Sequence, residues 1–348
     1  MIAMKNVPGI ITLALTLAVS AGGAPLQRGD IAGDAKWLLH LDVDNLRSTH
    51  VGDFIGRQII TPNLITPRAM FQQVLGLDLD WQKISSVTAY GSDYGAKAGE
   101  RGVLVIKTTM PFGAALEAFT KAHGGGGSGD ADGSPVPIER LDSPRLPLYR
   151  LHGELLVGAP SPNVILLAKS RELIERAADV IAGKAASVAN NKDTTLYDHA
   201  PKAFFFFAAA EALNEDTKVP REAEVLKMAD GGRVVVGEDA GRLFCNLLLR
   251  AKTLQVATQM QQIVQGIVAL VTMSQTENKE LLQLVQSAKV SSDDRAVTVN
   301  LEYPVDQAIE RLRHDKIGQK ESSDGASEKK AEAETKPKAD PTDKSNDK

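Results

Sequence analysis

Three residues whose side chains could bind a metal ion lie close together near the start of the chain: His40, Asp42 and Asp44. Alternate residues of a β-strand point to the same face, so His40 and Asp42 would lie roughly 6.5 Å apart along a strand, close enough to share a metal ion. A third ligand would complete the site of a metal-dependent hydrolase, but the sequence fixes none. An H-x-D-x-D run also lacks the context of a specific motif. We therefore assign no catalytic, cofactor-binding or metal-binding residue, and keep the hydrolase as an alternative.

The same residues also fit a purely structural interpretation. On a strand covering 36–44, one face is apolar and is the expected core face: Trp37, Leu39, Leu41 and Val43. The opposite face carries His40 and Asp42 and is expected to be partly wet. Asp44 would then lead into a loop, and Ser48 or Thr49 would cap the next helix.

Two glycine-containing motifs occur between residues 123 and 129, and neither has the surroundings that its chemistry requires. Gly124, Gly126 and Gly129 match G-x-G-x-x-G, but a dinucleotide site needs a strand before the glycines and a helix after them. His123 followed by three glycines matches the oxyanion loop of lipases, but the chain contains no G-x-S-x-G nucleophile elbow. We expect residues 124–137 to form a flexible surface loop.

A second strongly apolar run occurs at Phe204 to Phe207, flanked by Lys202 and Glu211. Nothing polar accompanies the four rings to orient a ligand, so a buried central strand is favoured over an aromatic binding platform. Strict alternation would place Phe205 and Phe207 on one face, and Phe204 and Phe206 on the other.

The pattern of elements around these strands predicts an α+β protein. β-rich runs separated by turn residues predict hairpins at 85–108 and 233–251, and helical stripes follow capping residues or prolines at 111, 170 and 253. We expect two similar units, each a largely antiparallel sheet with helices packed on one face. The first unit covers 35–184, a linker covers 185–200, and the second unit covers 201–317.

The two ends of the chain have distinctive compositions. Residues 1–21 have the order of a secretory signal peptide, with Lys5, an apolar stretch and small residues at the end. Residues 22–34 would form a short linker. Residues 318–348 hold many charged residues and no large apolar ones, which predicts a disordered tail. We expect an exported, periplasmic or extracellular protein with no transmembrane helix after cleavage of the signal; a signal kept as an anchor is the alternative.

Composition excludes some partners. The formal net charge is −4, with charges of both signs interspersed, whereas a nucleic-acid-binding protein would carry a clustered basic face. The single cysteine, Cys245, cannot form an intramolecular disulfide, and its apolar surroundings in sequence predict an inert buried thiol.

The stretch from Asp34 to Gly52, DAKWLLHLDVDNLRSTHVG, resembles the opening of uncharacterised exported proteins from Verrucomicrobia and Planctomycetes. The resemblance implies export and a duplicated α+β body, and it carries no catalytic residues. We therefore expect an exported non-catalytic protein that binds a partner protein or a small ligand. The alternatives are the metal-dependent hydrolase and a structural protein attached to the cell envelope.

Overall fold

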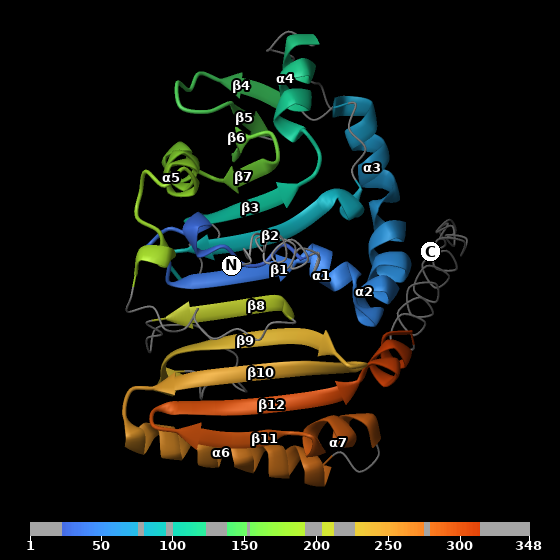
Figure 1. The fold of residues 1–348 in the computed structure, drawn as a ribbon, viewed down its shortest axis with the longest axis vertical. Coiled ribbons are helices and arrows are strands. Elements are labelled where there is room, and N and C mark those ends of the chain that lie inside the picture. Colours follow the sequence, from blue (N-terminus) through green and yellow to red (C-terminus); the bar gives the residue numbers. More distant parts are fainter. Residues whose placement is uncertain are drawn as a thin grey trace, which may run out of the picture. The chain divides into compact units, whose positions relative to one another are not determined.

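The computed structural model describes residues 23–75, 80–94, 100–122, 138–151, 154–191, 204–211, 227–274 and 279–313. Their strands form one twelve-stranded sheet in the order β11-β12-β10-β9-β8-β1-β2-β3-β7-β6-β5-β4 (Figure 1). The first seven strands are β1 (Trp37–Asp42), β2 (Ile84–Gly91), β3 (Gly102–Thr108), β4 (Ile138–Leu141), β5 (Leu148–Leu151), β6 (Leu155–Ser161) and β7 (Val164–Ala168). The others are β8 (Phe204–Glu211), β9 (Ala229–Asp239), β10 (Arg242–Ala251), β11 (Lys289–Asp293) and β12 (Ala296–Pro304).

All neighbouring strands in this sheet are antiparallel, which confirms the expected α+β architecture. The two expected units share this one sheet, because β1 pairs with β8 from Trp37 opposite Ala210 to Leu41 opposite Phe206. Tyr94 reinforces this junction. Its hydroxyl lies 2.6 Å from the carbonyl oxygen of Lys36, just before β1, and 2.5 Å from that of Glu211, at the end of β8.

Three helices follow β1 in sequence: α1 (Val43–Arg47), α2 (His50–Ile55) and α3 (Thr61–Leu75), the last two joined by the π-helical turn η2 (Gly56–Ile60). Asp42 caps α1 by accepting a hydrogen bond from the Asn45 amide. Thr49 caps α2 through the Gly52 amide, as its position in the sequence predicts. The other helices are α4 (Phe112–Ala122), α5 (Arg171–Ile181), α6 (Leu254–Ser274) and α7 (Lys279–Gln286), and a further helix covers 305–313.

The two faces of the central strands carry different side chains. We call inner the face that bears Leu38, Val105, Phe207 and Val235, and outer the face that bears Leu39, Leu104, Phe206 and Val234; the strand registers place each set on one side. Helix α5 packs on the inner face, where Ile174 joins a cluster with Leu166. Helix α4 packs on the outer face, where Phe112 and Leu116 join Ile165. The helices of the first half therefore cover both faces, not one.

The inner face is sealed by segments for which the sequence predicts linkers. Ile31 is fully buried and Val188 is 2% exposed. The Val188 amide donates to the Ile31 carbonyl oxygen at 2.9 Å, and Ala32 forms an isolated bridge with Ser187. These segments therefore contribute to the core through a few apolar side chains, Ile31, Ala32, Ala35 and Val188, which share a buried cluster with Ile174 of α5.

The expected signal peptide (1–21), the glycine-rich loop (124–137) and the charged tail (318–348) lie outside the described residues. No helix among the described residues is long and apolar enough to cross a membrane.

Candidate functional site

His40 lies in the interior of the inner face. Its side chain is 2% exposed, and its Nδ1 atom is 2.8 Å from the hydroxyl oxygen of Thr88 on β2. The Nε2 atom is buried without a hydrogen-bond partner. Burial lowers the pKa of His40 to about 4, against a smaller opposing effect of the Ala24 backbone. The ring is therefore neutral at neutral pH.

The two aspartates are engaged by other groups. Asp42 Oδ1 accepts from the Asn45 amide at 2.8 Å and from the Ala24 amide at 3.0 Å, so it both caps α1 and holds residues 23–24 against the sheet. Asp44 lies on α1 and forms an ion pair with Arg47. Among the described residues, no group of three or more His, Cys, Asp or Glu side chains is placed to hold a metal ion.

The burial of β1 differs from the expectation. Leu38, His40 and Asp42 are buried, whereas Leu39 is 45% exposed and Trp37 and Leu41 are half-buried. The expected core face is thus the more open one. The reason is tertiary: residues 23–35 pack over the inner face, and this cover includes the polar groups that satisfy Asp42.

The phenylalanine run also departs from strict alternation. The pairing of β8 with β9 shifts between Phe204 and Phe206, so an extra residue is inserted into β8 at this point. As a result Phe204 and Phe207 lie together, with ring centroids 5.9 Å apart, and Phe204 also meets the His40 ring edge-on. Phe205 and Phe207 are buried, and Phe204 and Phe206 are half-buried.

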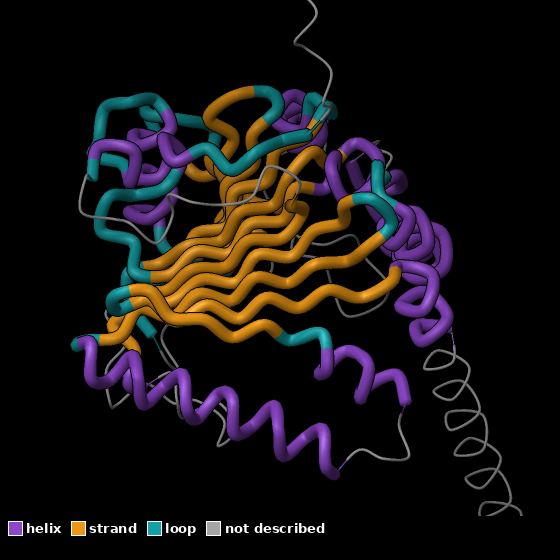
Figure 2. The backbone as a smooth tube through the Cα atoms, turned by 60° about the horizontal axis from the view of Figure 1, so that its bottom comes forward, coloured by secondary structure: helices purple, strands orange, loops and turns teal. Residues whose placement is uncertain are grey.

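Most of the exposed large hydrophobic side chains of the described residues lie on the outer side of the sheet, on β1 and on α6. Eight large hydrophobic side chains of the described residues are exposed; one is Leu39 on the outer face, and five are on α6: Leu254, Ile263, Ile267, Leu270 and Met273. Helix α6 packs on β10 and β12 through Ala257 and Met260, which are buried with Leu249 and Val297. Toward its C-terminal end the helix diverges from the strands (Figure 2).

The composition of α6 is unusual for a surface helix. From Leu254 to Ser274 it contains no charged and no aromatic residue. Sequence periodicity places Ile267 on the buried face and Gln residues on the other, but in the structure Ile267 is 44% exposed. A signal was available in the sequence, since the apolar stripe of this uncharged helix is wide and the sheet covers only part of it.

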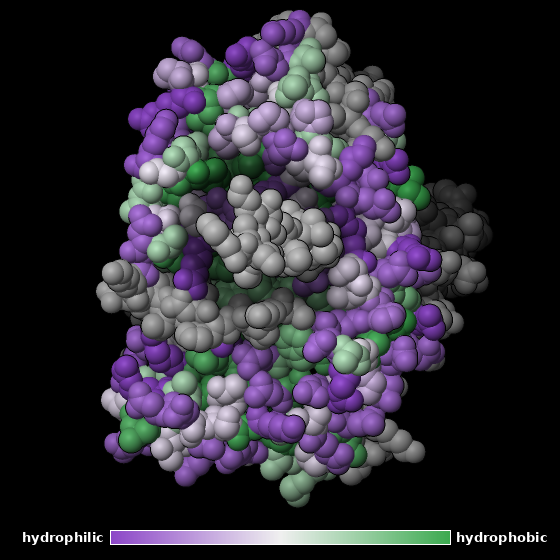
Figure 3. All heavy atoms as spheres, viewed as in Figure 1, coloured by the Kyte–Doolittle hydropathy of each residue, from purple (hydrophilic) through white to green (hydrophobic). Residues whose placement is uncertain are grey.

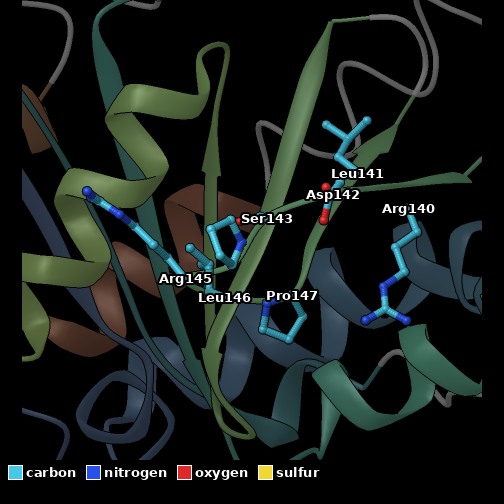
Figure 4. A pocket seen from close by; sticks show the side chains of 8 residues that line it. Arg140, Leu141, Asp142, Ser143, Arg145, Leu146 and Pro147 are labelled. Carbon is cyan, nitrogen blue, oxygen red and sulfur yellow. The ribbon is translucent and has the colours of Figure 1, made fainter.

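A hollow is present where β4 turns into β5, lined by Arg140 to Pro147 (Figure 4). Arg145 points away from Arg140 toward α5, where it lies 3.1 Å from Asp179 and 3.7 Å from Glu175. The hollow contains one hydroxyl, Ser143, and its lining includes no histidine or cysteine. The Ser143 hydroxyl is buried without a hydrogen-bond partner, so no base, Asp142 included, activates it as a nucleophile.

Cys245 lies on the outer face of β10, opposite Val236. It is half-buried, and burial raises the pKa of its thiol. A raised pKa leaves little thiolate at neutral pH, so Cys245 is poorly suited to nucleophilic chemistry.

Comparisons with known proteins add little to this geometry. No family model matches the sequence, and no curated protein matches it. Two crystal forms of TP0453 are similar in structure. Form III has a TM-score of 0.44 and 10% sequence identity, and the match covers 82% of this chain and 98% of that chain. Form I has a TM-score of 0.42 and 9% sequence identity, and the match covers 83% of this chain and 97% of that chain.

Proposed function

We propose that this protein is an exported, non-catalytic binding protein and that α6 is the surface through which it binds. The observation that carries the proposal is the exposed apolar ridge on an uncharged helix of 21 residues. Val256, Met260, Ile263, Ile267 and Leu270 recur at spacings of four and three residues, which is the repeat that packs one helix against another. Met260 is buried by the sheet, whereas the last three residues face solvent.

The chemistry of α6 favours a protein helix over a membrane as the occupant. Helices that lie in a membrane surface carry Lys, Arg or Trp where the polar face meets the lipid, and α6 has none of these residues. Gly266 lies within the exposed part, and a Cβ atom there would meet nothing within 4 Å. Glycine in a helix interior is less stable than alanine by about 1 kcal/mol, but it allows the backbone of a second helix to approach closely.

The partner that fits best is a second copy of this chain. Charges beside an apolar seam select one partner helix over another. Because α6 has no charges, it provides neither attraction to a charged partner nor repulsion between two identical helices. In the view of Figure 3, hydrophilic residues are spread between small groups of hydrophobic ones.

The experiment is sedimentation equilibrium of the exported protein, compared with Ile267→Glu and Gln265→Glu. The two positions are about 200° apart round the helix axis, so the second variant adds the same charge on another side. We expect dimers for the unchanged protein and for Gln265→Glu, and at least a tenfold weaker association for Ile267→Glu. A monomer at about 100 μM would refute the proposal. So would binding to neutral lipid vesicles that Ile267→Glu abolishes while the protein in solution remains a monomer.

Export is supported by the composition of residues 1–21 and is tested on its own. Amino-terminal sequencing of the protein recovered outside the cytoplasm of a bacterial host should begin near Gly22. A sequence that still starts at Met1 would favour the anchored alternative.

A further inference from the structure

Three charged side chains share the inner face near one end of β8, β9 and β10. Glu211 is opposite Gly231, and Gly231 is opposite Arg250 on its other side. Arg233 lies two residues along β9 from Gly231, so its side chain points to the same face. Arg233 is therefore a diagonal neighbour of both Glu211 and Arg250, at Cα distances of about 7–8 Å.

Arg233 is more than nine-tenths buried, with 8% of its surface exposed. Its Nε atom has no hydrogen-bond partner, and no carboxylate of the described residues lies within 4.0 Å of its guanidinium group. Burial lowers the pKa of this side chain. A buried guanidinium is normally paired with an acidic group, because removing its charge from water is costly.

The acidic groups nearby do not supply this pairing. Glu211 has one carboxylate oxygen, Oε1, that is buried and without a hydrogen-bond partner, and burial raises its pKa. Asp230 lies 3.9 Å from Arg250 Nε. The residues opposite Arg233 on the neighbouring strands are apolar, Ala209 and Leu248. The inner face therefore presents a planar cation flanked by apolar side chains.

We infer that Arg233 forms the centre of a binding site for a small oxyanion, a carboxylate or a phosphate group. The guanidinium group offers parallel N–H donors that match two oxygens of such a group. The apolar neighbours of Arg233 give the low dielectric in which a charge-assisted hydrogen bond is strong. This site is independent of α6, which lies on the other side of the sheet.

The test is isothermal titration of the full chain with inorganic phosphate and with acetate, at an ionic strength held constant with sodium chloride. The variant is Arg233→Leu. The matched control is Arg242→Leu, since Arg242 lies on β10 with its side chain about half exposed and paired with Glu302 at 3.1 Å. We expect at least one oxyanion to bind the unchanged chain and the control with similar affinity, and Arg233→Leu to bind it at least tenfold more weakly.

Equal binding by Arg233→Leu, or binding of neither anion by the unchanged chain, would overturn the assignment. Measuring the stability of the ligand-free protein distinguishes an anion-binding Arg233 from an Arg233 that forms an internal ion pair. An arginine that awaits a ligand is unpaired in the free protein, so the unfolding equilibrium constant of Arg233→Leu should be no larger than that of the unchanged chain. An increase of more than tenfold would mean that Arg233 already pairs with Glu211 in solution, and the site would be refuted.

Discussion

On the inner face of β1, Leu38, His40 and Asp42 are all buried, although two of the three are polar; on the outer face, Leu39 is apolar and 45% exposed. The neighbouring strands show the same contrast. Every second residue of β9 from Gly231 to Gly237 is buried on the inner face, while the valines between them are half-buried. Which face of these strands is buried depends on the segments that pack against that face, and not on the hydropathy of the strand residues. Asp42 is accommodated inside because its carboxylate accepts hydrogen bonds from two backbone amides, those of Ala24 and Asn45.

The contrast has different consequences on the two faces. The inner face holds titratable groups in a low dielectric, so it responds to protons and, as we infer for Arg233, to anions. The outer face and α6 leave apolar surface in contact with water, which favours covering by a partner.

The largest expected effect is on truncation of a buried ring. Phe207 is fully buried on the inner face, whereas its neighbour Phe206 is half-buried on the outer one. Phe207→Ala should lower the free energy of unfolding by about 3–5 kcal/mol, and Phe206→Ala by distinctly less. Urea denaturation of both variants measures this, and equal losses would mean that the two faces are packed alike.

Acid should destabilise the inner face through His40. The pKa of His40 is lowered from 6.5 to about 4 on folding, so between these pH values the unfolded chain binds more protons than the folded one. Stability therefore falls as the pH falls from about 6.5 to 4 and changes no further from this source below that window. A shift of this size corresponds to roughly 3 kcal/mol.

His40→Gln is the control for that effect, since glutamine is uncharged throughout the window. The difference in unfolding free energy between the two proteins should change with pH between 6.5 and 4 and be constant above pH 7. Parallel stability curves over the whole range would show that His40 titrates as freely in the folded state as in the unfolded one.

A smaller effect is expected at the junction of the two halves. Tyr94→Phe removes the hydroxyl that lies between the carbonyl oxygens of Lys36 and Glu211, and should cost about 1 kcal/mol. Tyr149→Phe provides a matched control, because the Tyr149 hydroxyl is buried without a hydrogen-bond partner and its removal should cost nothing. Thermal unfolding that ranks the two variants the other way would contradict this view of the junction.

Local patterns in the sequence were sufficient to predict the hairpins formed by β2 with β3 and by β9 with β10, since β-rich runs and turn residues mark both. The strand at 37–42 was also predicted, but its buried face was not. That face depends on residues 23–35, which resemble a linker because apolar residues are few there, yet Ile31 and Ala32 are buried. When a strand face is buried by a segment from elsewhere in the chain, the alternation of apolar residues in the strand does not show which face is buried.

The candidate sites also depend on contacts that the local sequence does not reveal. His40 and Asp42 do share a face, as alternation requires, but the partners that engage them, Thr88 and Ala24, come from distant or irregular segments. The extra residue in β8 that brings Phe204 beside Phe207 cannot be recognised in the sequence, because all four residues of the run are phenylalanine. Arg233 is one arginine before a run of valines, and only the strand register reveals its relation to Glu211 and Arg250.

The most direct test of the contrast between the faces uses two adjacent leucines of β1. Leu38 is fully buried on the inner face, and Leu39 is 45% exposed on the outer face. In urea denaturation at pH 7.5, Leu38→Ala should lower the free energy of unfolding by about 2–5 kcal/mol, and Leu39→Ala by about 1 kcal/mol or less. A larger loss for Leu39→Ala than for Leu38→Ala would show that the outer face is the sealed one, and would contradict the account.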